Sequence, residues 1–201
     1  MKPPGEEDNR RLGTLLLNTL EREMRLWRAP VLKNGCIQGS DICPSQYQEV
    51  IVWMHEMSTV YQFSSETFAL GVCVLNSLIA TVKAQFKYLK CMAITSLILA
   101  AKINEEDEVI ASVRHLLEQS GCKFSTAEIL RMERIILNKL HWDLYIATPI
   151  DFIHIVSTTD ICIQTRTQPY KKEKKTDNTV LRTLTKIDVC SLTLCTWCSR
   201  T

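Results

Sequence analysis

The chain has 201 residues, of which 46% are apolar, and this size and composition favour one domain with a substantial buried core. Its 24 Lys and Arg nearly balance 22 Asp and Glu, so the formal charge of +2 supplies no long-range field that would gather nucleic acid or acidic lipid. Its longest uncharged apolar stretch, Cys91 to Ala101, is shorter than the roughly 20 residues that span a bilayer, and the N-terminus lacks an apolar signal core, so we expect a soluble intracellular protein.

The first predicted elements are three helices. An amphipathic helix is predicted from Asn9 to Trp27, where apolar residues recur every three or four positions between Arg and Glu. After a polar linker, Pro44 stands where a helix tolerates proline, in its first turn, so a second helix is predicted from Ser45 to about Met57. Ser64 can cap a third helix by accepting an amide hydrogen bond ahead of the apolar run Phe68 to Leu78.

The next segment is apolar nearly all round. Residues Leu89 to Ala101 lack Gly and Pro and are rich in Ala, which predicts a central helix with close neighbours on most sides. A short helix is predicted from Glu108 to Gln119. Ser125 and Glu128 then have the spacing of a capping box, which predicts the start of a further amphipathic helix, and Pro149 starts another turn.

These elements predict an all-α fold. No interior segment shows sustained strand alternation and the connections are short, so the body up to about Ile155 is predicted to be five or six packed helices. The character changes from Ser157 to Thr201, which is rich in Thr, carries the lysine run Lys171–Lys175 and lacks a long helical stripe. We expect a disordered tail there.

Several stretches, in this order, resemble the cyclin box: Glu66–Leu70, Leu78–Lys83, Tyr88–Cys91, Leu99–Asp107, Glu128–Leu137, Trp142–Leu144 and Ala147–His154. The match covers residues 1 to about 156 without large gaps, and the last stretches are most similar to the I type of the cyclin family, with the G type next. The resemblance implies one cyclin-box bundle of five helices in residues 43–156, preceded by an N-terminal helix and linker in residues 1–42 and followed by the disordered tail in residues 157–201.

The resemblance also implies a function. In this family one face, made by the third and fifth box helices, holds a protein kinase, and the two charged residues that mark it match Lys102 and Glu133. A Lys and a Glu can satisfy backbone groups at the ends of partner elements. The family's apolar contact positions match four further residues: Leu99, Ile103, Leu137 and Leu144. The chain would then be a regulatory subunit of a cyclin-dependent protein kinase in cell-cycle or differentiation control, in nucleus and cytoplasm.

Each of these residues also has a simpler interpretation. The four apolar residues stand at helical spacing and fit a core equally well. Lys102 could cap its own helix, and Glu133 could pair with Arg131 or Arg134 on the surface. If the resemblance holds, Lys102 and Glu133 should be exposed at the rim of one apolar patch containing Leu99, Ile103 and Leu137.

The sequence departs from the family pattern at two helices and in its length. Typical members pair an Arg in the first box helix with an Asp in the second, and Tyr47 and Asn76 stand at these positions, so no buried charge is stranded. Gln46 and Glu49 replace apolar groups of the patch that reads Arg-x-Leu substrates, and we expect no such recruitment. Family members also carry a second helical fold, so a truncated isoform is expected, which leaves an inert or dominant-negative product as an alternative function.

Other chemistry finds little support. The acids Glu105–Glu108 are typical of surface charge at a helix start, and the four histidines are scattered with no nucleophile motif or phosphate-binding loop, so we expect no catalytic centre, cofactor or small-molecule substrate. Cys195 and Cys198, with Cys190 upstream, make only half of a zinc site, so no metal is expected. Lys171–Lys175 could be a nuclear import signal or a solvated run. An adaptor in transcription is a further alternative, but it would need a basic face.

Overall fold

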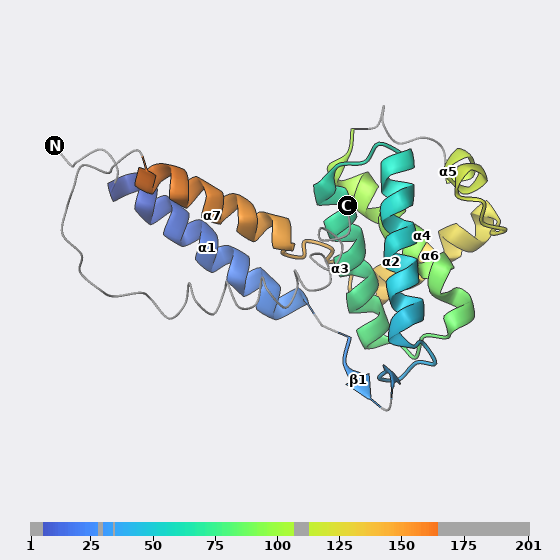
Figure 1. The fold of residues 1–201 in the computed structure, drawn as a ribbon. Helices are drawn as coiled ribbons and strands as arrows, with labels where there is room; N and C mark the ends of the chain where they lie inside the picture. The colour runs from blue at the N-terminus through green and yellow to red at the C-terminus, as the bar shows by residue number, and fades with distance from the viewer. Residues whose placement is uncertain (1–5, 28–29, 34, 107–112, 165–201) are drawn as a thin grey trace. The chain divides into compact units, whose positions relative to one another are not determined.

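The computed structural model describes residues 6–27, 30–33, 35–106 and 113–164. The described part contains seven helices and one two-stranded antiparallel ribbon (Figure 1). The helices are α1 (Glu6–Leu26), α2 (Pro44–Val60), α3 (Ser65–Thr81), α4 (Phe86–Asn104), α5 (Val113–Ser120), α6 (Thr126–Lys139) and α7 (Pro149–Gln164), and the strands are β1 (Leu32–Lys33) and β2 (Cys36–Ile37). The predicted all-α class is confirmed. Among the described helices, none is both long and apolar enough to cross a bilayer.

The described chain falls into two compact units. One unit contains the beginning of α1, up to Leu17, together with α7, and the other runs from Asn18 to Thr148. The larger unit therefore holds helices α2 to α6 and the C-terminal half of α1, and every candidate site residue named above lies in it.

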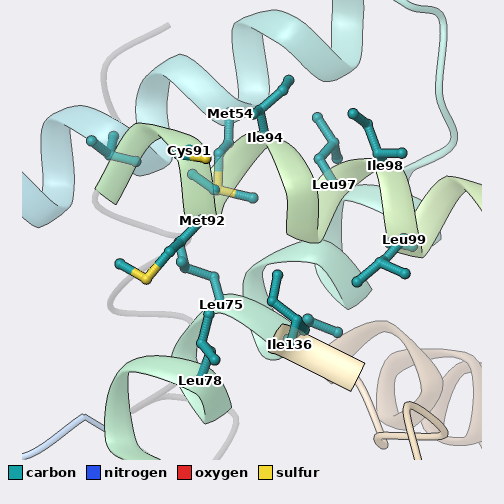
Figure 2. Close-up of a cluster of buried hydrophobic side chains, with 14 of the residues drawn as sticks. Met54, Leu75, Leu78, Cys91, Met92, Ile94, Leu97, Ile98, Leu99 and Ile136 are labelled. Atoms are coloured by element: carbon teal, nitrogen blue, oxygen red, sulfur yellow. The ribbon is translucent and has the colours of Figure 1, made fainter. Parts of the chain in front are cut away.

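Helix α4 is the centre of the larger unit. Every residue from Cys91 to Ala101 is buried, and α4 packs against α2, α3 and α6 (Figure 2). The apolar stretch Cys91 to Ala101 thus lies in the central helix of the bundle, as its Ala-rich, all-round apolar pattern predicted.

Glycine makes the closest helix approach possible. A Cβ added at Gly71 of α3 would lie 3.3 Å from the Cα of Leu97 in α4. That is tighter than ordinary van der Waals contact with a backbone atom, so the missing side chain of Gly71 lets the two backbones meet.

The predicted helix caps are present. The Ser64 hydroxyl accepts from the Thr67 amide at 3.3 Å, and the Ser125 amide donates to Glu128 Oε2 at 2.7 Å while the Ser125 hydroxyl accepts from the Glu128 amide. A third cap was not predicted: the Cys43 amide, before α2, donates to the Gln46 side chain at 3.0 Å.

The two residues that stand in place of the family's ion pair contact each other. The Tyr47 hydroxyl of α2 donates to Asn76 Oδ1 of α3 at 2.5 Å. A neutral hydrogen bond therefore joins the two helices where the resemblance implied charges.

One helix boundary differs from the predicted one, and other predictions concern residues outside the described part. The last helix runs to Gln164, beyond the predicted end of the box at residue 156, because no Gly or Pro after Pro149 interrupts it. The helix predicted from Glu108 is described only from Val113, since residues 107–112 lie outside the described part. The predictions for Lys171–Lys175 and for the tail cysteines also concern residues outside it.

Candidate functional site

Lys102 and Glu133 meet across two helices. Lys102 lies in the last turn of α4, where a cation is favoured by the carbonyl end of the helix. Its Nζ donates to Glu133 Oε1 of α6 at 2.7 Å. Glu133 therefore forms its ion pair with Lys102 of another helix, in contrast to the alternative in which it pairs with a neighbouring arginine of its own helix.

The two partners of this pair are buried to different degrees. The Lys102 side chain is 39% exposed, whereas the Glu133 side chain is only 15% exposed. Glu133 was expected to be an exposed rim residue, and that expectation is wrong because its carboxylate lies where α4 and α6 pack against each other. Its second oxygen, Oε2, is buried and has no hydrogen-bond partner among the described residues.

The four predicted apolar contact residues divide into two groups. Leu99 and Leu144 are buried members of the main core cluster, so the core interpretation describes them in this structure. Ile103, directly after Lys102, is 50% exposed, and Leu137, one turn after Glu133, is partly buried against the core. The predicted patch therefore reaches the surface through Ile103 and Leu137, and contact with a partner stays a prediction for all four.

Two exposed apolar residues beside these were not singled out from the sequence. Leu130 is 52% exposed and precedes Glu133 by three positions, which places it on the same flank of α6 as Glu133 and Leu137. Trp142 is 68% exposed and follows the end of α6. Leu130 could have been identified as a candidate surface residue from the sequence, because it is an apolar residue on the side of the helix away from Ile129 and Ile136. Six residues make the α4–α6 face: Lys102, Ile103, Leu130, Glu133, Leu137 and Trp142.

Trp142 is held in an unusual turn. His141 and Trp142 have φ angles of 55° and 61°, a left-handed conformation that costs a non-glycine residue roughly 1 kcal/mol or more. The Trp142 amide donates to the Leu137 carbonyl at 2.8 Å and its indole Nε1 donates to Asn138 Oδ1 at 3.2 Å. These bonds close the end of α6 and keep the indole beside it.

Glu105 has a structural role that the sequence analysis missed. It was read as part of an acidic run at a helix start, but it caps the end of α4, and its Oε1 accepts from the Ser64 amide, the Ser64 hydroxyl and the Thr67 hydroxyl at 2.6–2.8 Å. Burial alone would raise the pKa of Glu105, but the hydrogen bonds from Thr67 and Ser64 outweigh it and hold the pKa below its ordinary value. One carboxylate therefore ties the end of α4 to the beginning of α3.

The positions of the family's substrate-docking patch are also placed. Gln46 is engaged in capping α2, and Val50 is buried in the core. Trp53 is partly buried against the core, with the Lys90 ammonium 5.6 Å from its ring centroid. Within the described residues no three His, Cys, Asp or Glu side chains are gathered as a metal site.

Comparison with known proteins gives one consistent result. Residues 16–145 match the family model described as "Cyclin, N-terminal domain". The chain is 43% identical to human cyclin-I2 over 151 residues, which is 75% of this chain and 39% of that protein. It is 34% identical to human cyclin-G2 over 121 residues, which is 60% of this chain and 35% of that protein. The chain thus spans well under half of the length of these relatives.

A solved structure shares the fold. The crystal structure of a viral cyclin from herpesvirus saimiri superposes with a TM-score of 0.60 at 20% identity, over 76% of this chain and 65% of that one. At this level of identity the likeness concerns the fold alone.

Proposed function

The chain belongs to the cyclin family, and from this premise we propose that it is a regulatory subunit that binds a cyclin-dependent protein kinase through the α4–α6 face. In this proposal the chain supplies no catalytic group. It acts by holding an element of the kinase in one position, in the nucleus and cytoplasm.

The observation that carries the proposal is that the Lys102–Glu133 ion pair leaves hydrogen-bonding groups without a partner among the described residues. Glu133 Oε2 is buried and unpartnered among the described residues, and a buried acceptor without a donor is unfavourable by about 1 to 3 kcal/mol. Lys102 has three N–H donors, of which one points to Glu133. A partner that donates to Glu133 and accepts from Lys102 would complete both groups.

Such a partner would present the ends of backbone elements. The amide groups at the beginning of a helix donate without an intrahelical acceptor, and the carbonyl groups at its end accept without a donor. A carboxylate suits the first and an ammonium the second. Ile103 directly follows Lys102 and Leu130 lies three positions before Glu133, and both expose apolar surface. A docked protein would remove this surface from water, which strengthens the charged hydrogen bonds.

The test is direct binding. The full chain should capture at least one member of a panel of purified cyclin-dependent kinases, and Glu133→Ala should weaken that capture at least tenfold. Arg114→Ala is the matched control, because it removes an exposed ion pair to Glu118 on α5 and no residue of the face. Kinase phosphorylation of a peptide substrate, measured with and without the chain, separates activation from occupation.

Two results would refute the proposal. One is a folded chain that binds no kinase of the panel, which favours the inert-isoform alternative. The other is salt-dependent binding to duplex DNA in place of kinase binding, which would favour a transcriptional adaptor.

A further inference from the structure

The C-terminal half of α1 contacts the segment that follows Trp142. Arg25 Nη2 lies 3.2 Å from Asp143 Oδ2, and the Arg22 guanidinium carbon lies 3.9 Å from the centroid of the Tyr145 ring. The two arginines are three positions apart in a helix and therefore lie on one side of it. They contact two residues of the same short segment: Arg25 forms an ion pair with Asp143, and Arg22 forms a cation–π contact with Tyr145.

The segment 143–145 also contains an internal hydrogen bond. Asp143 Oδ1 accepts from the Tyr145 amide at 3.3 Å, while Asp143 Oδ2 faces Arg25. Both oxygens of this carboxylate are thus in use, and the contacts run without a break from Arg25 through Asp143 and Tyr145 to Arg22.

This arrangement bears on Trp142 because Trp142 directly precedes Asp143. The left-handed turn at His141 and Trp142 is intrinsically unfavourable, so it persists only where neighbouring contacts hold it. The hydrogen bonds to Leu137 and Asn138 hold it from the side of α6. The two arginines hold its other end.

We propose that Arg22 and Arg25 are positioning residues of the α4–α6 face: they keep the segment 143–145 in place and thereby set the exposed indole of Trp142 before a partner arrives. The inference rests on the proposed function insofar as it concerns binding. It assigns to the N-terminal helix an effect on a surface to which neither arginine belongs.

The expected effect is modest and local. Arg25 is largely exposed, and exposed ion pairs and cation–π contacts each stabilise a structure only slightly. Their loss should leave global unfolding nearly unchanged but lower the fraction of molecules with Trp142 in place. Because only that fraction binds, the apparent dissociation constant should rise roughly three- to tenfold.

A double-mutant cycle on the full chain tests whether Arg25 acts on binding through Asp143. Arg25→Ala and Asp143→Asn each remove the ion pair, and Asn keeps an acceptor for the Tyr145 amide. If the two residues act through each other, the double variant should bind the kinase captured in the panel no more weakly than either single variant. Tyr145→Phe should keep the affinity and Tyr145→Leu should lower it, because the ring and not the hydroxyl faces Arg22. Arg114→Ala is again the control.

A second readout does not depend on the kinase. In the chain labelled with 5-fluorotryptophan, fluorine NMR gives one signal for each of the four tryptophans, and Trp142→Phe identifies that of Trp142. Arg25→Ala should shift or broaden the Trp142 signal and leave that of Trp53 in place. An unchanged Trp142 signal, or additive losses of affinity in the cycle, would overturn the inference. A shifted signal in a chain that binds no kinase would uphold the positioning and refute the proposed function.

Discussion

Removing the two members of the Lys102–Glu133 pair should have unequal effects on stability. Lys102→Ala leaves Glu133, a carboxylate only 15% exposed, without its hydrogen-bond donor. Its other oxygen already has no partner among the described residues, so neither oxygen would then be satisfied. We expect Lys102→Ala to lower the free energy of unfolding by about 1 to 2 kcal/mol, the lower part of the range for a stranded buried group, because some water reaches this site.

The opposite substitution should be better tolerated. In Glu133→Ala the Lys102 ammonium, on a side chain already 39% exposed, can turn to water, and the buried carboxylate is gone. We expect a loss of about 0 to 1 kcal/mol, as for other exposed charges. The double variant should resemble Glu133→Ala, so adding Glu133→Ala to Lys102→Ala should restore about 1 kcal/mol.

The assay is urea unfolding of the full chain followed by circular dichroism at 222 nm, with the three variants and Arg114→Ala as the control ion pair. Equal losses in the two single variants, or a double variant less stable than Lys102→Ala, would refute the reasoning from burial. Either result would mean that water or a rotation of Glu133 satisfies the carboxylate.

Three further predictions concern the scaffold. Glu105→Gln should lower the free energy of unfolding by about 1 kcal/mol near neutral pH. Because the folded pKa of Glu105 is lowered, the carboxylate stabilises the fold above its unfolded pKa of about 4.3. The difference in unfolding free energy between wild type and variant, measured by urea unfolding, should therefore disappear as the pH falls through the folded pKa. Ser125→Ala should lower the free energy of unfolding by about 1 kcal/mol through the lost cap, and Ser125→Gly by less. Gly71→Leu should lower the melting temperature by several degrees, since its side chain would enter the contact with Leu97 and overpacking costs about 1 to 3 kcal/mol.

Local signals predicted the helices well. Ser64 and Ser125 could be identified as caps because a cap and the amide it serves are three residues apart in sequence. The apolar run of α4 predicted a central helix because only a helix with neighbours on most sides can bury such a surface. The end of α7 was not predicted, because the prediction required an amphipathic stripe and α7 continues to Gln164 without one.

Non-local contacts were the part that sequence could not supply. The resemblance indicated Lys102 and Glu133 separately, but their pairing joins residues 31 positions apart and depends on how α4 and α6 pack. The same packing decides that Leu99 and Leu144 lie in the core while Leu130 and Trp142 reach the surface. Glu105 was misread for the same reason, since its three donors lie about 40 residues earlier in the chain.

The bond between Tyr47 and Asn76 has a consequence for the conditions under which this domain keeps its shape. An ion pair between two helices weakens as dissolved ions screen it, and it vanishes when either partner loses its charge. A phenol and a carboxamide are both uncharged at physiological pH, so neither ionic strength nor acidification should weaken this hydrogen bond. The Tyr47–Asn76 hydrogen bond between α2 and α3 should therefore contribute as much to stability in concentrated salt as in dilute buffer.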